Sequence, residues 1–132
     1  MNDTEKFEWV KARHECSTGS MFEKLRLDVK ADVETRQGLR EKTEFGYING
    51  FTFSSRSDRF SANAATSNSR QSVIFVLQGN DIAVTDENDQ LVFRGKVTLS
   101  NDRVCRFVVD DQELEDWQFR KKALEGLFFG KK

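Results

Sequence analysis

The sequence predicts an α+β domain, in which an antiparallel sheet of six or seven strands carries an N-terminal helix and a long C-terminal helix. Three patterns indicate this class. Apolar residues recur at helical spacing from residue 20 to 37, alternate at every second position from 43 to 109, and return to helical spacing after 110. The chain has 132 residues and no linker, repeat or low-complexity stretch, so we expect residues 1–132 to form a single α+β domain.

The clearest element is a helix from Ser20 to about Gln37. Ser20-Met-Phe-Glu23 fits a capping box, in which the serine side chain accepts from the Glu23 amide. Gly38 is a natural end for the helix. The apolar residues that we expect on its buried face are Phe22, Leu25, Val29 and Val33.

Residues 7–16, which precede this helix, fit either a short helix or a strand. As a helix, the segment places Cys16 with Trp9 and Ala12, and turns His14 about 200° away around the axis. As a strand, it places His14 and Cys16 on one face, about 7 Å apart. That distance still exceeds the roughly 3 Å of a thiolate–imidazole hydrogen bond, so neither form makes them a catalytic pair.

The sheet is predicted from the period of two between Thr43 and Val109. Residues 72–78 are apolar on both faces, which is typical of a central strand, and further strands are expected at 82–85, 91–99 and 103–109. Short connections make neighbouring strands antiparallel. Asn49-Gly50 is a two-residue hairpin signal, so residues 43–55 form one long strand or two short ones. Aromatic residues of one parity there are Phe45, Tyr47, Phe51 and Phe53.

The C-terminal helix is expected from Asp110 onward. Asp110-Asp111 is interpreted as capping, and acidic residues precede a basic group at 120–122, an order that complements the helix dipole. The predicted buried stripe consists of Leu114, Trp117, Leu124 and Phe128.

In its order of elements the chain resembles two architectures. A helix-grip fold has a first strand, helices, six strands and a C-terminal helix lying across the sheet, and the firm helix before the sheet favours it. A pleckstrin-homology-like domain, the runner-up, has seven strands and a capping helix, often with a tryptophan at a position like that of Trp117. The Asn49-Gly50 hairpin favours this second resemblance.

Composition indicates a compact globular domain. The apolar fraction is 37%, and 12 phenylalanines supply most of the bulk, so a core can form without metal or disulfide. The net charge of −1 provides no overall field toward nucleic acid or acidic lipid. Because the chain has two cysteines, no long apolar run and a polar start, we expect a cytoplasmic protein without a membrane span, with both thiols free.

Motifs for chemistry are not found, and the sequence predicts no catalytic residue, no cofactor and no metal site. Residues 86–89 faintly match a calcium loop but lack its glycine and final glutamate, and a solvated turn is the favoured interpretation. Cys105 alternates with Phe107 and Val109 on one strand face, as a small core residue does. Glycines never occur at the spacing of a phosphate-binding loop.

Two groups of residues are candidates for a nucleic-acid-binding surface, and for each of them another interpretation is favoured. Arg56, Arg59 and Arg70 could contact phosphates, but a solvated loop is favoured because Asp58 intervenes and the net charge is not basic. Phe45, Tyr47, Phe51 and Phe53 could stack bases, but four aromatics on one strand face are more typical of a core.

The function favoured by these observations is a non-catalytic cytoplasmic binding or interaction module. Its partner is a small apolar ligand, held between the sheet and the C-terminal helix, or a protein. Self-association into a homodimer is expected through Phe129 and Trp9, which the helix patterns leave near the surface. The alternatives are a small hydrolase or isomerase that uses dispersed carboxylates and arginines and, less favoured, a single-stranded nucleic-acid binder.

Overall fold

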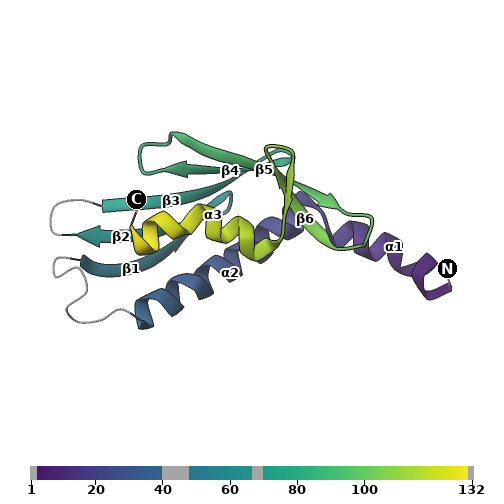
Figure 1. Cartoon of the computed structure of the whole chain (residues 1–132), viewed down its shortest axis with the longest axis horizontal. Helices are drawn as coiled ribbons and strands as arrows, with labels where there is room; N and C mark the ends of the chain where they lie inside the picture. Colours follow the sequence, from purple (N-terminus) through teal and green to yellow (C-terminus); the bar gives the residue numbers. More distant parts are fainter. Residues whose placement is uncertain (1–2, 40–47, 67–69, 131–132) are drawn as a thin grey trace.

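The computed structural model describes residues 3–39, 48–66 and 70–130, and it confirms the α+β class. Two helices precede the sheet, α1 and α2, and a third, α3, follows it (Figure 1). All seven strands form one open antiparallel sheet in which each strand pairs with its neighbours in sequence. The elements are α1 (Asp3–Glu15), α2 (Thr18–Gly38), β1 (Ile48–Ser55), β2 (Arg59–Thr66), β3 (Arg70–Gln78), β4 (Asp81–Asp86), β5 (Leu91–Leu99), β6 (Cys105–Val109), β7 (Gln112–Leu114) and α3 (Asp116–Phe129).

The core lies between the sheet and the two helices α2 and α3, which run side by side along one face (Figure 1). Phe119 of α3 is fully buried and stacks on Phe107 of β6, with ring centroids 4.2 Å apart. A Cβ atom at Gly95 of β5 would come within 2.6 Å of the Phe119 ring, so glycine is what allows α3 to approach the sheet this closely. Phenylalanine rings therefore fill the space in which a ligand pocket was expected.

Helix α2 buries the predicted face but begins earlier than predicted. Phe22, Leu25, Val29 and Val33 are all buried. The capping residue is Ser17 rather than Ser20, and the Ser17 side chain accepts from the Ser20 amide at 3.1 Å. The capping-box prediction was wrong because two residues at the proper spacing do not show where the extended chain first turns into a helix.

Asn49 and Gly50 both lie inside strand β1, so of the two alternatives for residues 43–55 the described part, from Ile48 onward, is a single strand. This removes the feature that favoured the pleckstrin-homology-like resemblance. Gly50 has a φ of +134° and lies against the Gln37 side chain, whose Oε1 accepts from the Phe51 amide at 2.8 Å. The end of α2 thus supplies a hydrogen-bond acceptor to a backbone amide of the edge strand β1. Two of the aromatic residues predicted on this strand, Phe45 and Tyr47, lie outside the described residues.

The seventh strand instead comes from the segment that was assigned to the start of the C-terminal helix. Val109 pairs with Gln112, and the intervening Asp110 and Asp111 have φ values of 50° and 65°. Positive φ at both central residues identifies a tight two-residue hairpin turn, so these aspartates turn a strand and do not cap a helix. The strand before this turn begins at Cys105, slightly later than the predicted residue 103.

Helix α3 therefore begins at Asp116, and its buried face differs from the predicted stripe. Trp117 is 54% exposed, whereas Phe119, Ala123, Leu124 and Phe128 are buried. The dipole explanation for the charge order was also wrong, because the first turn contains Asp116 alone among acids and the last turn contains no basic residue. Of the predicted buried stripe, Leu124 and Phe128 are the residues that are buried in the structure.

Residues 7–16 are helical up to Glu15, and the two cysteines are not free. Cys16 and Cys105 form a disulfide, with a Cα–Cα distance of 5.5 Å across 89 residues of sequence. The prediction of free thiols was wrong because spacing along the chain carries no information on which distant elements meet. In the described parts of the chain, no helix has the length and apolar character needed to cross a membrane.

Candidate functional site

An apolar groove lies between α2 and α3. Its volume is about 340 Å³. Buried Leu124 and Phe128 contribute to its floor, and exposed side chains of Leu39, Trp117 and Phe129 stand along it. We call this surface the α2–α3 groove; it is lined by Asp32, Thr35, Arg36, Leu39, Trp117, Arg120, Lys121, Leu124, Glu125, Phe128 and Phe129.

One end of the groove is organised by Arg36, a buried arginine from α2. Its Nε donates to the carbonyl oxygen of Phe128 at 2.9 Å, which ties α2 to the end of α3. The guanidinium lies over the rings of Phe51 and Phe129, 4.8 Å and 4.9 Å from their centroids. Phe129 is nevertheless 63% exposed, so one side of its ring contacts the arginine while most of the side chain faces solvent.

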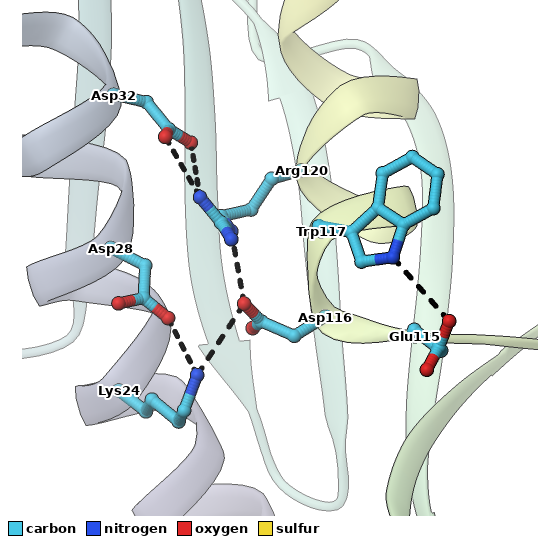
Figure 2. A network of polar contacts seen from close by, with 7 residues as sticks. All are labelled: Lys24, Asp28, Asp32, Glu115, Asp116, Trp117 and Arg120. Carbon is cyan, nitrogen blue, oxygen red and sulfur yellow. Dashed lines mark hydrogen bonds and ion pairs between the residues drawn. The ribbon is translucent and has the colours of Figure 1, made fainter. Parts of the chain in front are cut away.

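Charged side chains join α2 to the first turns of α3 at the other end of the groove (Figure 2). Arg120 Nη1 donates to both carboxylate oxygens of Asp32, at 2.8 Å and 2.7 Å, and its Nε donates to Asp116 at 3.0 Å. Lys24 reaches Asp28 at 2.7 Å and Asp116 at 3.4 Å. We call Lys24, Asp28, Asp32, Asp116 and Arg120 the polar network, and it holds the two helices in parallel register.

The two carboxyl groups at the centre of this network have opposite pKa shifts. Burial raises the pKa of Asp116, against the attraction of Arg120 and Lys24. Burial would also raise the pKa of Asp28, but the hydrogen bonds from Lys24 and Asp116 outweigh it and lower that pKa. Oδ1 of Asp116 is buried with no hydrogen-bond partner among the described residues, which agrees with burial as the main cause of its raised pKa.

The cations of the network are held in their charged forms. Burial alone would lower the pKa of Lys24, but its hydrogen bond to Asp28 and the charges of Asp116 and Asp28 raise it. The same balance applies to Arg120, whose pKa is raised chiefly by its hydrogen bond to Asp32. A partner that binds in the groove therefore contacts Arg120 as a member of existing ion pairs.

A second cavity, of about 470 Å³, lies where α1 meets α2, next to the disulfide. Trp117 and Arg120 line both cavities, so the two surfaces adjoin. We call this second cavity the corner pocket; it is lined by Ala12, Glu15, Cys16, Met21, Lys24, Leu99, Arg103, Val104, Cys105, Glu115, Asp116, Trp117 and Arg120.

The residues singled out in the sequence do not converge on a reactive site. His14 is exposed on α1, while Cys16 is buried and bonded to Cys105. Within the described ranges, no group of three potential metal-binding side chains comes together. Residues 86–89 form the turn between β4 and β5, where the Asp86 carboxylate accepts from the amides of Asn88 and Gln90.

The three arginines of the predicted loop lie at opposite ends of the β2–β3 hairpin. Arg56 and Arg59 lie at the turn between β1 and β2, whereas Arg70 pairs with Ala65 at the opposite end of the β2–β3 hairpin. Arg59 is paired with Asp58 at 3.3 Å. Of the four aromatics on the predicted face, Phe51 and Phe53 pack in or against the core.

Sequence reasoning missed the residues that shape the groove. Arg36 and Asp32 were not singled out in the sequence, and Arg120 was assigned to a basic group that complements the helix dipole. Their roles depend on contacts over 88 to 92 residues, which no local spacing reveals. The usable signal was the crowding of Leu127, Phe128 and Phe129, since one helix face cannot bury three consecutive large side chains.

Comparison of the chain with protein-family models, curated proteins and solved structures gives no match. Fold and groove together define an α+β domain with an apolar surface groove between its two packed helices.

Proposed function

We propose that this domain is a non-catalytic protein-interaction module that receives the apolar face of a helix in the α2–α3 groove. The observation that carries the proposal is the exposure of Trp117, Phe129 and Leu39 along one groove, above a core that is already filled. Exposed aromatic side chains beside buried apolar ones are typical of sites where a protein partner anchors. A groove between two helices suits an amphipathic helix, whose apolar positions recur every three or four residues.

Helix α1 of a second copy is the partner that the chain itself supplies. Its 13 residues extend about 20 Å, and the groove from Trp117 to Phe129 extends about 18 Å along α3. Trp9 and Val10 of α1 are 64% and 58% exposed, so this helix carries uncovered apolar surface of its own. Since short isolated helices are marginally stable in water, α1 gains order from such docking.

A two-fold dimer makes this arrangement reciprocal, with α1 of each copy in the groove of the other. Its test is sedimentation velocity or light scattering at tens of micromolar. We expect the wild-type chain to be a dimer, and Phe129→Asp and Trp9→Asp each to be a monomer. When the two variants are mixed, the intact Trp9 of one meets the intact groove of the other, so the mixture should form a heterodimer.

Two results would contradict the proposed partner. A wild-type chain that stays monomeric at this concentration excludes α1 of a second copy as the occupant. A dimer that Phe129→Asp and Trp9→Asp both leave intact excludes the groove as the interface. Leu27→Asp is the matched control, because Leu27 is 68% exposed on α2 but does not line the groove, and it should change nothing.

A hydrolase or isomerase is the second candidate, and the raised pKa of Asp116 in the corner pocket is the observation that favours it. We rank it below the interaction module because Asp116 is already bound by Lys24 and Arg120, which gives the carboxylate a structural role. Turnover of a simple ester or amide panel that is lost in Asp116→Asn, while the fold is retained, would reverse this order.

A further inference from the structure

The Cys16–Cys105 disulfide occupies a position from which it can control helix α1. Cys16 lies at the corner between α1 and α2, directly before the capping residue Ser17. Cys105 is the first residue of β6. The disulfide therefore attaches the corner between α1 and α2 to β6, near the edge of the sheet. From this corner α1 extends beyond the sheet (Figure 1).

In the part of α1 whose side chains the structure describes, residues 9–15, few other contacts hold the helix in place. Between Trp9 and Glu15, Ala12 is the single side chain that is even partly buried. Helix α2, in contrast, is anchored without the bond: Met21 and Phe22 are buried, and the Thr18 hydroxyl donates to the carbonyl oxygen of Asn80 at 3.3 Å. Loss of the disulfide would thus free α1 while α2 stays on the sheet.

The bond can also be reached from solvent. Both cysteines line the corner pocket, whose volume of about 470 Å³ leaves room beside the sulfur atoms. Cys16 is only 2% exposed, whereas Cys105 is partly exposed, so an attacking thiolate approaches the sulfur of Cys105.

We propose that Cys16–Cys105 is a reversible redox clasp, and that its reduction releases α1 and the corner from the body of the domain. A dithiol reductant supplies both electrons. One of its thiolates attacks Sγ of Cys105, the S–S bond breaks, and the Cys16 thiolate leaves and takes up a proton. The second thiol of the reductant then displaces Cys105, which leaves as a thiolate and is protonated. Two cysteine thiols and the disulfide of the reductant are the products.

The expected consequence is local and not global. Once its corner is free, the 13-residue helix α1 has too few contacts to remain ordered, because helices of this length are marginal alone. Ala12 then moves away from the corner pocket and uncovers Met21 and Leu99 on the pocket wall. In an oxidising compartment the disulfide would be formed and would hold α1 in place. In a reducing compartment the two cysteines would be thiols, and the disulfide would form only during oxidative conditions.

Hydrogen exchange of the oxidised and reduced protein tests the clasp, with dithiothreitol as the dithiol. The measurement uses the Phe129→Asp chain, so that docking of α1 into a second copy cannot protect it. We expect reduction to speed exchange of amides 9–16 by at least about tenfold, while amides 22–33 of α2 change less than about twofold. Trypsin cleavage after Lys11 and Arg13 should accelerate in parallel.

The Cys16→Ala, Cys105→Ala double variant is the control, and it should match the reduced protein whether or not dithiothreitol is present. Unchanged exchange at 9–16 after complete reduction would overturn the proposal, because α1 would then be held by contacts other than the bond. Faster exchange throughout α2 and the sheet would also overturn it, since the bond would then be required for the fold as a whole. Neither outcome depends on whether the chain dimerises.

Discussion

Phe119 and Trp117 are two positions apart on α3 and have opposite environments. The Phe119 ring is completely buried against Phe107 and Phe93, while Trp117 stands over the two cavities with its Nε1 directed at Glu115, 3.4 Å away (Figure 2). The difference follows from helix geometry, because two positions along an α-helix are about 200° around its axis, so the two side chains point in nearly opposite directions.

We therefore expect Phe119→Ala to lower the free energy of unfolding by about 3–5 kcal/mol, since it leaves a large cavity in the aromatic core. Trp117→Ala should cost about 1 kcal/mol or less, because more than half of that side chain already faces solvent. Urea denaturation of both variants measures the difference. Equal losses, or a larger loss for Trp117→Ala, would contradict the assignment of Trp117 to the groove.

The shifted carboxyl groups of the polar network predict how stability depends on pH. The raised pKa of Asp116 means that the folded chain binds this proton more tightly, so its contribution is present at low pH and is lost as the pH rises from the ordinary value near 3.8 through the raised pKa. The lowered pKa of Asp28 has the opposite effect, and its contribution is lost as the pH falls below 3.8 toward the lowered pKa.

Asp116→Asn removes the first of these two contributions, while Lys24 still lowers the pKa of Asp28. The variant's free energy of unfolding should consequently fall more steeply than that of the wild-type chain as the pH is lowered through the raised pKa of Asp116 toward 3.8. Urea titrations at several pH values measure the two slopes. Glu125→Gln, at an exposed position outside the network, is the matched control, and parallel curves for Asp116→Asn and wild type would show that the pKa of Asp116 is not raised.

At the scale of elements, the two long helices depend on each other and on the sheet. Helix α2 supplies Gln37 to the edge of β1 and Arg36 to the end of α3, and its Arg26 donates to the carbonyl oxygens of Arg56 and Ser57 in the β1–β2 turn. Helix α3 supplies Phe119, Leu124 and Phe128 to the core. Both exposed edges of the sheet are restricted, since β1 is covered by α2 and β7 has only three residues.

A chain that ends at Asp111 should accordingly fail to fold, because it lacks β7 and the whole of α3 and so uncovers Phe107, Phe75 and Phe93, which pack against Phe119. We expect no cooperative thermal transition by circular dichroism and aggregation at micromolar concentration. A chain that ends at Gly130, and so lacks only the last two lysines, is the control and should melt like the full chain. Cooperative melting of the shorter chain near the wild-type temperature would show that α3 is a dispensable tail.

At the scale of the whole molecule, charge is balanced, and the three arginines singled out in the sequence lie apart. The net charge is −1, and the sheet separates Arg70 from Arg56 and Arg59 by the length of a strand, roughly 20 Å. A phosphate backbone would therefore not meet these three arginines as one patch.

We expect single-stranded oligonucleotides to bind with a Kd weaker than micromolar at physiological salt, measured by fluorescence anisotropy. Replacing Arg56, Arg59 and Arg70 together with alanine should leave this weak binding almost unchanged. Submicromolar binding that the triple variant abolishes would instead identify a nucleic-acid surface that includes those arginines.

What the sequence determined by itself is the part of the fold that depends on local periodicity. Phe22, Leu25, Val29 and Val33 are three or four apart and predict α2, and the alternation through β2 to β6 predicts an antiparallel sheet, because one buried face imposes that period wherever the element packs. Element boundaries were less accurate: α2 is capped by Ser17 and not Ser20, and α3 begins at Asp116 and not Asp110, because several residues can cap a helix at similar local spacing.

Only the tertiary structure decided which distant residues meet. The Cys16–Cys105 bond spans 89 residues, Arg120 meets Asp32 across 88, and Arg36 meets Phe128 across 92. Each of these residues is locally indistinguishable from a solvated or core neighbour, because charge and size at one position are compatible with several environments. Packing α2 and α3 side by side on one face of the sheet selects among those environments, and it leaves Trp117 and Phe129 exposed along the groove between them.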